Sequence, residues 1–176
     1  MTLTSMSSKL ATDLVPSTFE VPCALETQAF RLRMLTVNDV VKDFDAVISS
    51  AEELCHLWPD STWPEGLTVE QNLIDLGWHQ KEFQRRSSFT YTVVELDESP
   101  VIGCGYIYPC LKVGFDAQVF FWTRPPEQIP NIEPTLLEHT VKDWLKEVWP
   151  LQAPAFPGLD IPWAEWDALP EKLIHG

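Results

Sequence analysis

The sequence is poor in basic residues: 12 Lys and Arg face 26 Asp and Glu, and the formal net charge at pH 7 is −14. A field of this sign repels phosphate backbones, so we expect no nucleic acid among the partners. The charge suits a cationic or amine-bearing ligand. The simpler interpretation is that it only keeps the protein in solution.

Cysteine is also scarce, and the four cysteines are not spaced as metal ligands. No C-x-x-C pair occurs and no histidine has zinc-finger spacing, so we expect no metal site. Four thiols are too few for a disulfide scaffold, which favours reduced thiols and a cytoplasmic location. The sequence lacks a basic start followed by an apolar stretch, and no apolar run nears the ~18 residues of a membrane span. We therefore expect neither a signal peptide nor a membrane segment.

No internal repeat or low-complexity tract divides the chain, whose 176 residues suit one sizeable core better than two domains. Residues 1–20 are rich in Ser and Thr and show no sustained periodicity, so we expect a loose N-terminal leader there. Residues 21–176 are expected to form a single domain. Eight Trp and nine Phe must pack its core or line a groove.

Apolar periodicity predicts the order strand, helix, helix, three strands, helix, strand, helix. Capping-box spacings at Thr36 and Thr68 predict the starts of the first two helices. Short connections predict that the three central strands form an antiparallel meander. The expected strands are 29–35, 89–96, 101–108, 115–123 and 152–156, and the expected helices are 37–57, 68–86, 137–148 and 163–169. This order predicts an α/β (α+β) domain with a mixed, mostly antiparallel sheet flanked by helices.

Several segments in this order resemble the GNAT superfamily of acetyl-coenzyme A dependent N-acetyltransferases. FRLRMLTVNDV (30–40) resembles the family's opening strand and first helix, and VIGCGY (101–106) resembles its third strand. AQVFFWTRP (117–125) resembles its fourth strand and exit. The resemblance covers residues 29–157. It implies a GNAT-like fold and the transfer of an acetyl group from acetyl-coenzyme A to a small amine.

The family's Q/R-x-x-G-x-G/A motif, which binds the coenzyme diphosphate, is matched by residues 128–134. Gln128 fits, and Asn131 replaces the first glycine, which is tolerable because Asn adopts left-handed geometry. Glu133 replaces the second small residue and places a carboxylate where a diphosphate would bind. Pro130 and Pro134 remove two amide donors. The resemblance implies coenzyme contacts at Phe121, Trp122, Thr123, Gln128 and Asn131.

The catalytic positions of the family are altered as well. Gln118 stands where the resemblance implies a glutamate base, and an amide cannot take a proton from an amine. Asp116, two residues earlier on the same strand face, could serve as the base. The family often places a tyrosine acid near its last strands, but this chain has no tyrosine after Tyr108. Tyr106 or Tyr108 on the neighbouring strand, or Cys104, would then serve as the acid.

Aromatic residues and one histidine are the candidate groups for holding the acceptor amine. The resemblance places the second helix beside the acceptor, which implies substrate contacts at Trp78 and His79. The simpler interpretations are core packing for Trp78 and a solvated helix face for His79. Trp163 and Trp166 are expected to pin the last helix, and if exposed they would mark a homodimer surface.

Three functions therefore remain open, the third being a transferase with a different acyl donor that lacks a pyrophosphate. The first is a GNAT N-acyltransferase that acts on a small amine. The second is a non-catalytic GNAT-fold binding or interaction module that has lost coenzyme A binding, in which Gln118 and Glu133 are the changes one expects. The groove between its fourth and fifth strands would then hold another ligand or a partner segment through the sheet edge.

Overall fold

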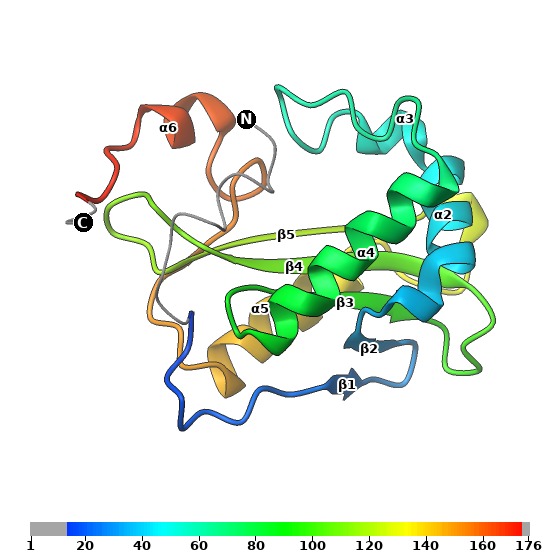
Figure 1. Cartoon of the computed structure of the whole chain (residues 1–176), viewed down its shortest axis with the longest axis horizontal. Helices are drawn as coiled ribbons and strands as arrows, with labels where there is room; N and C mark the ends of the chain where they lie inside the picture. The colour runs from blue at the N-terminus through cyan, green and yellow to red at the C-terminus, as the bar shows by residue number, and fades with distance from the viewer. Residues whose placement is uncertain (1–13, 174–176) are drawn as a thin grey trace.

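A computed structural model describes residues 14–173, which form a six-stranded sheet with helices on both faces (Figure 1). Every neighbouring pair of strands is antiparallel except the last, β5 with β6, which is parallel. In sheet order, which is also chain order, the strands are β1 (Ala24–Glu26), β2 (Arg31–Met34), β3 (Phe89–Val94), β4 (Val101–Pro109), β5 (Ala117–Thr123) and β6 (Pro154–Ala155). The predicted fold class is confirmed.

Helices α2 and α4 lie across one face of the sheet, and α5 lies across the other (Figure 1). The predicted capping box at Thr68 is formed, because Thr68 Oγ1 accepts the Gln71 N–H at 3.2 Å and Gln71 Oε1 accepts the Thr68 N–H at 3.0 Å. The helical segments are η1 (Val37–Asp39), α2 (Val40–Ser49), α3 (Ala51–Leu54), α4 (Val69–Gln84), η2 (Pro126–Gln128), α5 (Leu136–Val148) and α6 (Trp163–Ala168).

Two elements differ from the predicted ones. The first long helix is interrupted at Ser50, which is fully buried and has φ −114° and ψ 15°, so α2 and α3 are separate. Strand β1 was not predicted. It is only three residues long, and its exposed–intermediate–exposed pattern gives too few positions for an alternation to show.

The predicted loose leader is wrong for residues 14–20, and residues 1–13 lie outside the described residues. Val15 is 2% exposed within the core. The Leu14 N–H donates to the Arg86 carbonyl at 3.2 Å, and Phe19 packs on Trp149 with ring centroids 5.4 Å apart. A few apolar residues without periodicity are enough to attach this segment, because each one fills a site on an existing core.

The sheet separates two apolar clusters. The cluster on the α5 face is built around aromatic rings in edge-to-face contact, such as Tyr91 with Trp144 at 5.0 Å and Phe89 with Trp149 at 5.1 Å. The cluster on the α2 and α4 face contains Leu35, Ala46, Val47, Leu54, Leu76, Val94, Val101, Cys104, Tyr106, Tyr108, Phe120 and Trp122.

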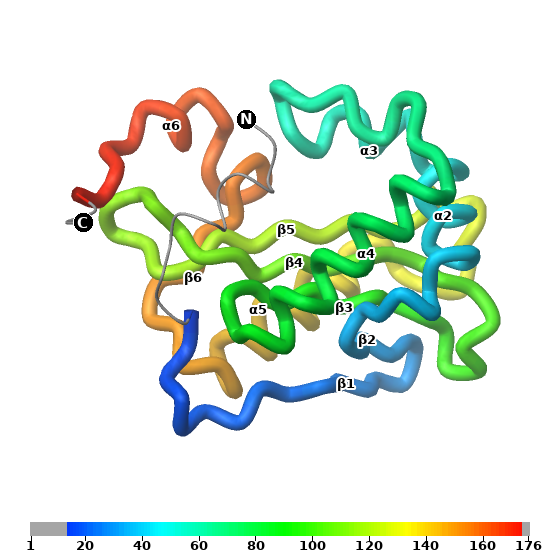
Figure 2. Tube along the Cα trace, viewed as in Figure 1, coloured from blue at the N-terminus to red at the C-terminus, as the bar shows by residue number. Residues whose placement is uncertain are grey.

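The segment after β6 folds back over one end of the sheet (Figure 2). Gly158 has φ +79°, and a Cβ there would lie 2.5 Å from the indole Nε1 of Trp163, so this turn requires glycine. Trp166 is 5% exposed and packs on Phe115, which fits its expected role of pinning α6. Lys172 Nζ then donates to the carbonyls of Cys110 at 2.9 Å and Phe115 at 2.6 Å, which ties this segment to the connection between β4 and β5.

Candidate functional site

The two tyrosines of β4 stand together on the α2 and α4 face, because residues two apart on a strand share a face. Their rings are stacked, with centroids 5.9 Å apart and an interplanar angle of 10°. The His79 ring from α4 lies 5.6 Å from that of Tyr106 and 6.4 Å from that of Tyr108. Trp78 contacts His79 at 5.0 Å. The structure thus brings together four of the residues predicted for the site.

The two tyrosine hydroxyls have different surroundings. The Trp122 Nε1–H donates to the Tyr106 hydroxyl at 3.1 Å, whereas the Tyr108 hydroxyl has no hydrogen-bond partner within residues 14–173. Burial raises the pKa of both tyrosines well above the usual value, so both remain protonated at neutral pH. Tyr108 is therefore a proton donor without a protein acceptor.

His79 is held as a neutral ring. Its Nδ1 lies 2.9 Å from the Thr90 hydroxyl of β3. Desolvation lowers the pKa of His79 to about 4, with the Glu82 charge acting weakly in the opposite direction. A base this weak does not deprotonate an ammonium at neutral pH, so His79 suits a positioning role better than a proton-accepting one.

Asp75 is a candidate that we did not predict. It precedes His79 by four residues on α4, so the two side chains emerge from the same side of the helix. Asp75 is exposed, desolvation raises the pKa of its carboxyl, and its charge adds to the burial that raises the pKa of Tyr108. The i, i+4 spacing of Asp75 and His79 was the sequence signal that could have identified it.

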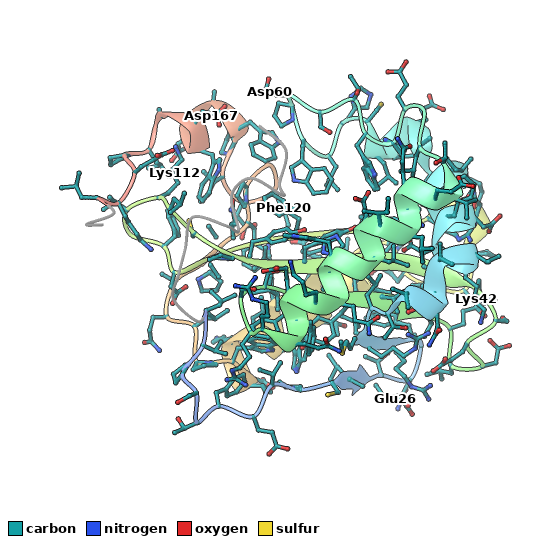
Figure 3. The ribbon with its side chains drawn as sticks, in the orientation of Figure 1. Glu26, Lys42, Asp60, Lys112, Phe120 and Asp167 are labelled. Carbon is teal, nitrogen blue, oxygen red and sulfur yellow. The ribbon has the colours of Figure 1, made fainter. Side chains whose placement is uncertain are left out.

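Partly exposed indoles surround the tyrosines. Trp58 and Trp63 come from the segment after α3, and Trp58 lies 5.7 Å from Phe120 and 6.0 Å from Tyr106. Trp163 stacks on Phe120 at 6.1 Å and 9°. In Figure 3, Phe120 lies below both the loop that carries Asp60 and the helix that carries Asp167. The aromatic cluster (Trp58, Trp63, Tyr106, Tyr108, Phe120, Trp163) therefore combines segments that are far apart in the sequence.

Asp116 and Gln118 are not directed at the tyrosines. The Asp116 carboxylate accepts backbone N–H groups of Gln152 and Ala153, the latter at 3.2 Å, and so joins the start of β5 to the segment before β6. Gln118 Nε2 donates to the Pro109 carbonyl at 3.2 Å. Both side chains are engaged in holding backbone, and the structure does not bring Asp116 together with its predicted partners.

The outer edge of β5 is paired along only part of its length. β6 pairs with Ala117 and Gln118 and ends there, beside one end of β5 (Figure 2). Two backbone bonds just beyond the ends of β5 show which of its residues face β4. The Cys110 N–H donates to the Asp116 carbonyl at 3.3 Å, and the Arg124 N–H donates to the Ile102 carbonyl at 2.7 Å.

In an antiparallel ladder, every second residue directs its N–H and C=O groups toward the neighbouring strand, so the even-numbered residues of β5 direct theirs toward β4. The backbone groups of Phe121 and Thr123 therefore point away from β4, and no described residue hydrogen-bonds to them from that side. Of the three strand residues predicted to contact a coenzyme, these two offer free backbone groups. Trp122 instead has a buried side chain that serves the site through Tyr106.

The loop after β5 is fastened to α2. The Arg124 guanidinium donates to Val101 O at 2.6 Å, to Ser49 Oγ at 2.7 Å and to Asp45 Oδ2 at 2.6 Å. Gln128 accepts from Arg124 at 3.2 Å, and its Nε2 donates to Ser49 O at 3.1 Å. The Gln128 side chain, predicted to contact a coenzyme, is occupied in this clamp.

The start of α5 is capped by Glu133. Its Oε2 accepts the Thr135 N–H at 3.0 Å and the Thr135 hydroxyl at 2.5 Å, and its carbonyl accepts the Leu136 N–H at 3.0 Å. A carboxylate at this position favours the positive end of the helix dipole. It also occupies the place that a diphosphate would take, and Asn131 beside it is exposed. The residues present at the start of α5 do not fit a diphosphate.

A separate open depression of about 490 Å³ lies beside α3, away from the tyrosines. It is lined by Ala51, Glu52, Cys55, Ser61, Thr62, Pro64 and Glu65. Within residues 14–173, no three His, Cys, Asp or Glu side chains are grouped as metal ligands. The same residues contain no helix with the length and apolar character needed to cross a membrane.

No family model and no curated protein matches the sequence, but solved structures match the fold. A ribosomal-protein-S5-alanine acetyltransferase from Vibrio fischeri aligns at 15% identity and TM-score 0.54, over 72% of this chain and 67% of the other. A GNAT-family acetyltransferase from Bordetella pertussis aligns at 13% and 0.52, over 70% and 69%. The microcin C7 self-immunity acetyltransferase MccE, solved with acetyl-coenzyme A and AMP, aligns at 8% and 0.57, over 72% and 67%.

These likenesses show that the chain has the fold of the GNAT acetyltransferases, as its resemblance to that superfamily predicted. At this level of identity they establish the architecture and leave the substrates open. The chemistry has to be argued from the side chains and the strand edge described above.

Proposed function

We propose that the protein is an N-acyltransferase that moves an acetyl group from a thioester, such as acetyl-coenzyme A, to a small amine. The observation that carries this proposal is the unpaired edge of β5 at Phe121 and Thr123; the neighbouring strand β4 carries the Tyr108 hydroxyl. An extended thioester arm can hydrogen-bond to such an edge as an added strand does. The acetyltransferase fold supports the same activity.

The proposed chemistry is direct acyl transfer. The amine nitrogen attacks the carbonyl carbon, the carbon–sulfur bond breaks, the amine loses one proton and the sulfur gains one. The free N–H groups of the β5 edge would polarise the carbonyl. Tyr108 would donate the proton to sulfur, and Asp75, rather than Asp116, would accept the proton of the ammonium directly or through water.

The aromatic cluster supports an acceptor with an apolar body and a cationic amine. Trp58 and Trp163 are partly exposed, and aromatic rings attract ammonium groups. The net charge of −14 also raises the concentration of cations near the protein surface. Peptide amines are the competing acceptors, because some structural neighbours are named for acetylating ribosomal proteins.

A cytoplasmic location and a homodimer also remain predictions.

The second candidate function is a non-catalytic binding module with this fold. The observation that favours it is Glu133, whose carboxylate caps α5 where a coenzyme diphosphate would bind. Gln118, with its side chain bonded to Pro109, points the same way. In this case the β5 edge and the aromatic cluster would hold a ligand that is not acetylated.

Thiol release from acetyl-coenzyme A and from S-acetylpantetheine, measured with a panel of aryl and alkyl amines and of peptides, tests the proposal. We expect release that depends on a small amine. Asp75→Asn should lower turnover about 100-fold, the usual contribution of a general base. The matched Asp116→Asn should keep turnover but unfold at lower urea, because it weakens the bonds to Gln152 and Ala153. Thioester or amine binding without thiol release would favour the module.

A further inference from the structure

Most amide groups of the loop that leads into α5 are engaged within the protein. Those of Gln128, Ile129 and Ile132 donate to carbonyls of the same loop. Those of Thr135 and Leu136 donate to Glu133. Pro130 and Pro134 have no amide hydrogen. Within the described residues, the amides of Asn131, Glu133, Leu137 and Glu138 in the stretch 128–138 lack an acceptor, and the Glu133 carboxylate lies at the same helix end.

The loop cannot easily rearrange to release these amides. Ile129 is 3% exposed and Ile132 is 8% exposed, so both anchor the loop in the core on the α5 face. The other side of the loop is fastened to α2 through Arg124 and Gln128. Arg124, the cation nearest in sequence, is already paired with Asp45 at 2.6 Å. An incoming diphosphate would therefore meet the Glu133 carboxylate and, among the described residues of this loop, no free cation to offset it.

We infer that this protein recognises its acyl donor through the thioester arm alone, and that a donor without a nucleotide diphosphate binds as well as acetyl-coenzyme A. This inference rests on the proposed function, because it assigns the donor to the free edge of β5. The ligand class is an acylated pantetheine or a similar small thioester. The recognised groups are its amides, which pair with the backbone of Phe121 and Thr123.

Calorimetric titration of the full chain with acetyl-coenzyme A, S-acetylpantetheine and adenosine 3′,5′-diphosphate tests this inference. We expect the two thioesters to bind with dissociation constants within about threefold of each other, because the nucleotide adds no contact. The free nucleotide should not bind and should not compete with S-acetylpantetheine.

Each other outcome has a defined meaning. If acetyl-coenzyme A binds more than about tenfold more tightly than S-acetylpantetheine, or if the nucleotide competes, the inference is overturned while the proposed function stands. If neither thioester binds, the inference and the proposed acyl transfer fail together. The two failures are therefore distinguishable.

The Glu133→Gln variant provides an internal check. It removes the charge but keeps an oxygen able to cap Thr135, so the fold should be retained, as a thermal melt can verify. Removal of one like charge should strengthen acetyl-coenzyme A binding by at most about threefold and leave S-acetylpantetheine unchanged. The Glu138→Gln variant, in the first turn of α5 at a carboxylate already paired with Lys142, is the matched control and should change neither. Equal strengthening of both thioesters by Glu133→Gln would contradict the inference.

Discussion

The two faces of the sheet differ in kind. On the α5 face, the buried side chains are almost all apolar or aromatic, from Phe30 and Leu32 to Trp144 and Leu145. The α2 and α4 face buries the site tyrosines together with groups that can ionise or hydrogen-bond, namely Asp39, Asp43, Asn72, Thr90, Thr92, Cys104 and Gln118. One face supplies most of the apolar stabilisation, while the other carries costly polar groups.

Asp43 shows that cost most clearly. It is 4% exposed, and its carboxylate accepts the Asn72 Nδ2–H at 2.9 Å, which links α2 to α4. Desolvation raises the pKa of Asp43 to about 6, against the weaker opposite effect of Asn72. A group that destabilises the fold at neutral pH is typical of a region that serves binding or chemistry, although structural networks also perturb pKa values.

The largest effect should come from the apolar face. Trp144→Ala removes a ring that contacts both Tyr91 and Trp149, at 5.0 and 5.5 Å, and should cost about 4 kcal/mol of unfolding free energy. Trp163→Ala, on the polar face, should cost about half as much because Trp163 is already partly exposed. Urea unfolding of the two variants measures the difference, and equal losses would break the comparison.

A pair of tyrosine variants should separate activity from stability. Tyr108→Phe removes a hydroxyl without a protein partner, so we expect stability within about 1 kcal/mol of the parent and kcat/KM lowered about 100-fold. Tyr91→Phe removes a hydroxyl that donates to Pro22 O at 2.6 Å. It should cost about 1 kcal/mol of stability and leave kcat/KM unchanged. Thiol-release assays and urea unfolding of both variants provide the measurement. A loss of kcat/KM in Tyr91→Phe with a loss of stability in Tyr108→Phe would contradict the proposed role of Tyr108.

Asp43 and His79 should have opposite effects on stability between pH 4 and 6.5. Asp43 has a folded-state pKa raised to about 6, so its contribution is complete below pH 4 and is lost as the pH rises through 6. His79 has a folded-state pKa lowered to about 4, so its contribution is complete above pH 6.5 and is lost as the pH falls toward 4. In the parent protein the two effects largely cancel.

Asp43→Asn should therefore expose the histidine effect. We expect it to stabilise the protein by about 2 kcal/mol at pH 7.5, to have little effect at pH 4, and to make stability rise with pH between those values. Thermal melts across this range provide the measurement. His79→Gln is the matched variant, and its stability should fall with rising pH. If the stability of Asp43→Asn does not change between pH 4 and 7.5, then Asp43 and His79 do not have opposite effects on the pH dependence of the parent.

The smallest effect should come from Gly158→Ala. The positive φ of 79° disfavours alanine, and the added Cβ would push on the Trp163 indole. We expect a loss of about 1 kcal/mol and a red shift of tryptophan fluorescence as Trp163 leaves Phe120. Gly114→Ala, at φ 91° with open space around the Cβ position, should cost similar stability without the spectral change. Identical spectra for the two variants would mean that Gly158 does not seat Trp163.

The sequence predicted the strands and helices well where periodicity is strong, as in the meander of β3 to β5 and in α4. It missed β1 and the attachment of Val15, since very short segments carry no period. Two of the altered family positions, Gln118 and Glu133, could be recognised from local sequence alone.

The wider site depends on contacts across long stretches of sequence, which no local pattern reports. Asp116 has the right strand face for a base, yet backbone amides of residues 152 and 153 take up its carboxylate. Trp163 reaches Phe120 only because the turn at Gly158 brings it back over the sheet. Gln128 fits the family motif by position, but its amide is used to hold α2.

The anchoring of Lys172 has a consequence for how the protein would respond to a protease. Lys172 lies 62 and 57 residues from the two residues whose carbonyls it holds, and it ties α6 to the far end of β4 and β5. A single cut between Leu169 and Lys172 would leave all the site residues named here in the chain. It would nevertheless remove the Lys172 restraint and leave α6 held by Lys112, which donates to the carbonyls of Asp167 and Leu169, so a nick outside the site would weaken the support of its aromatic half.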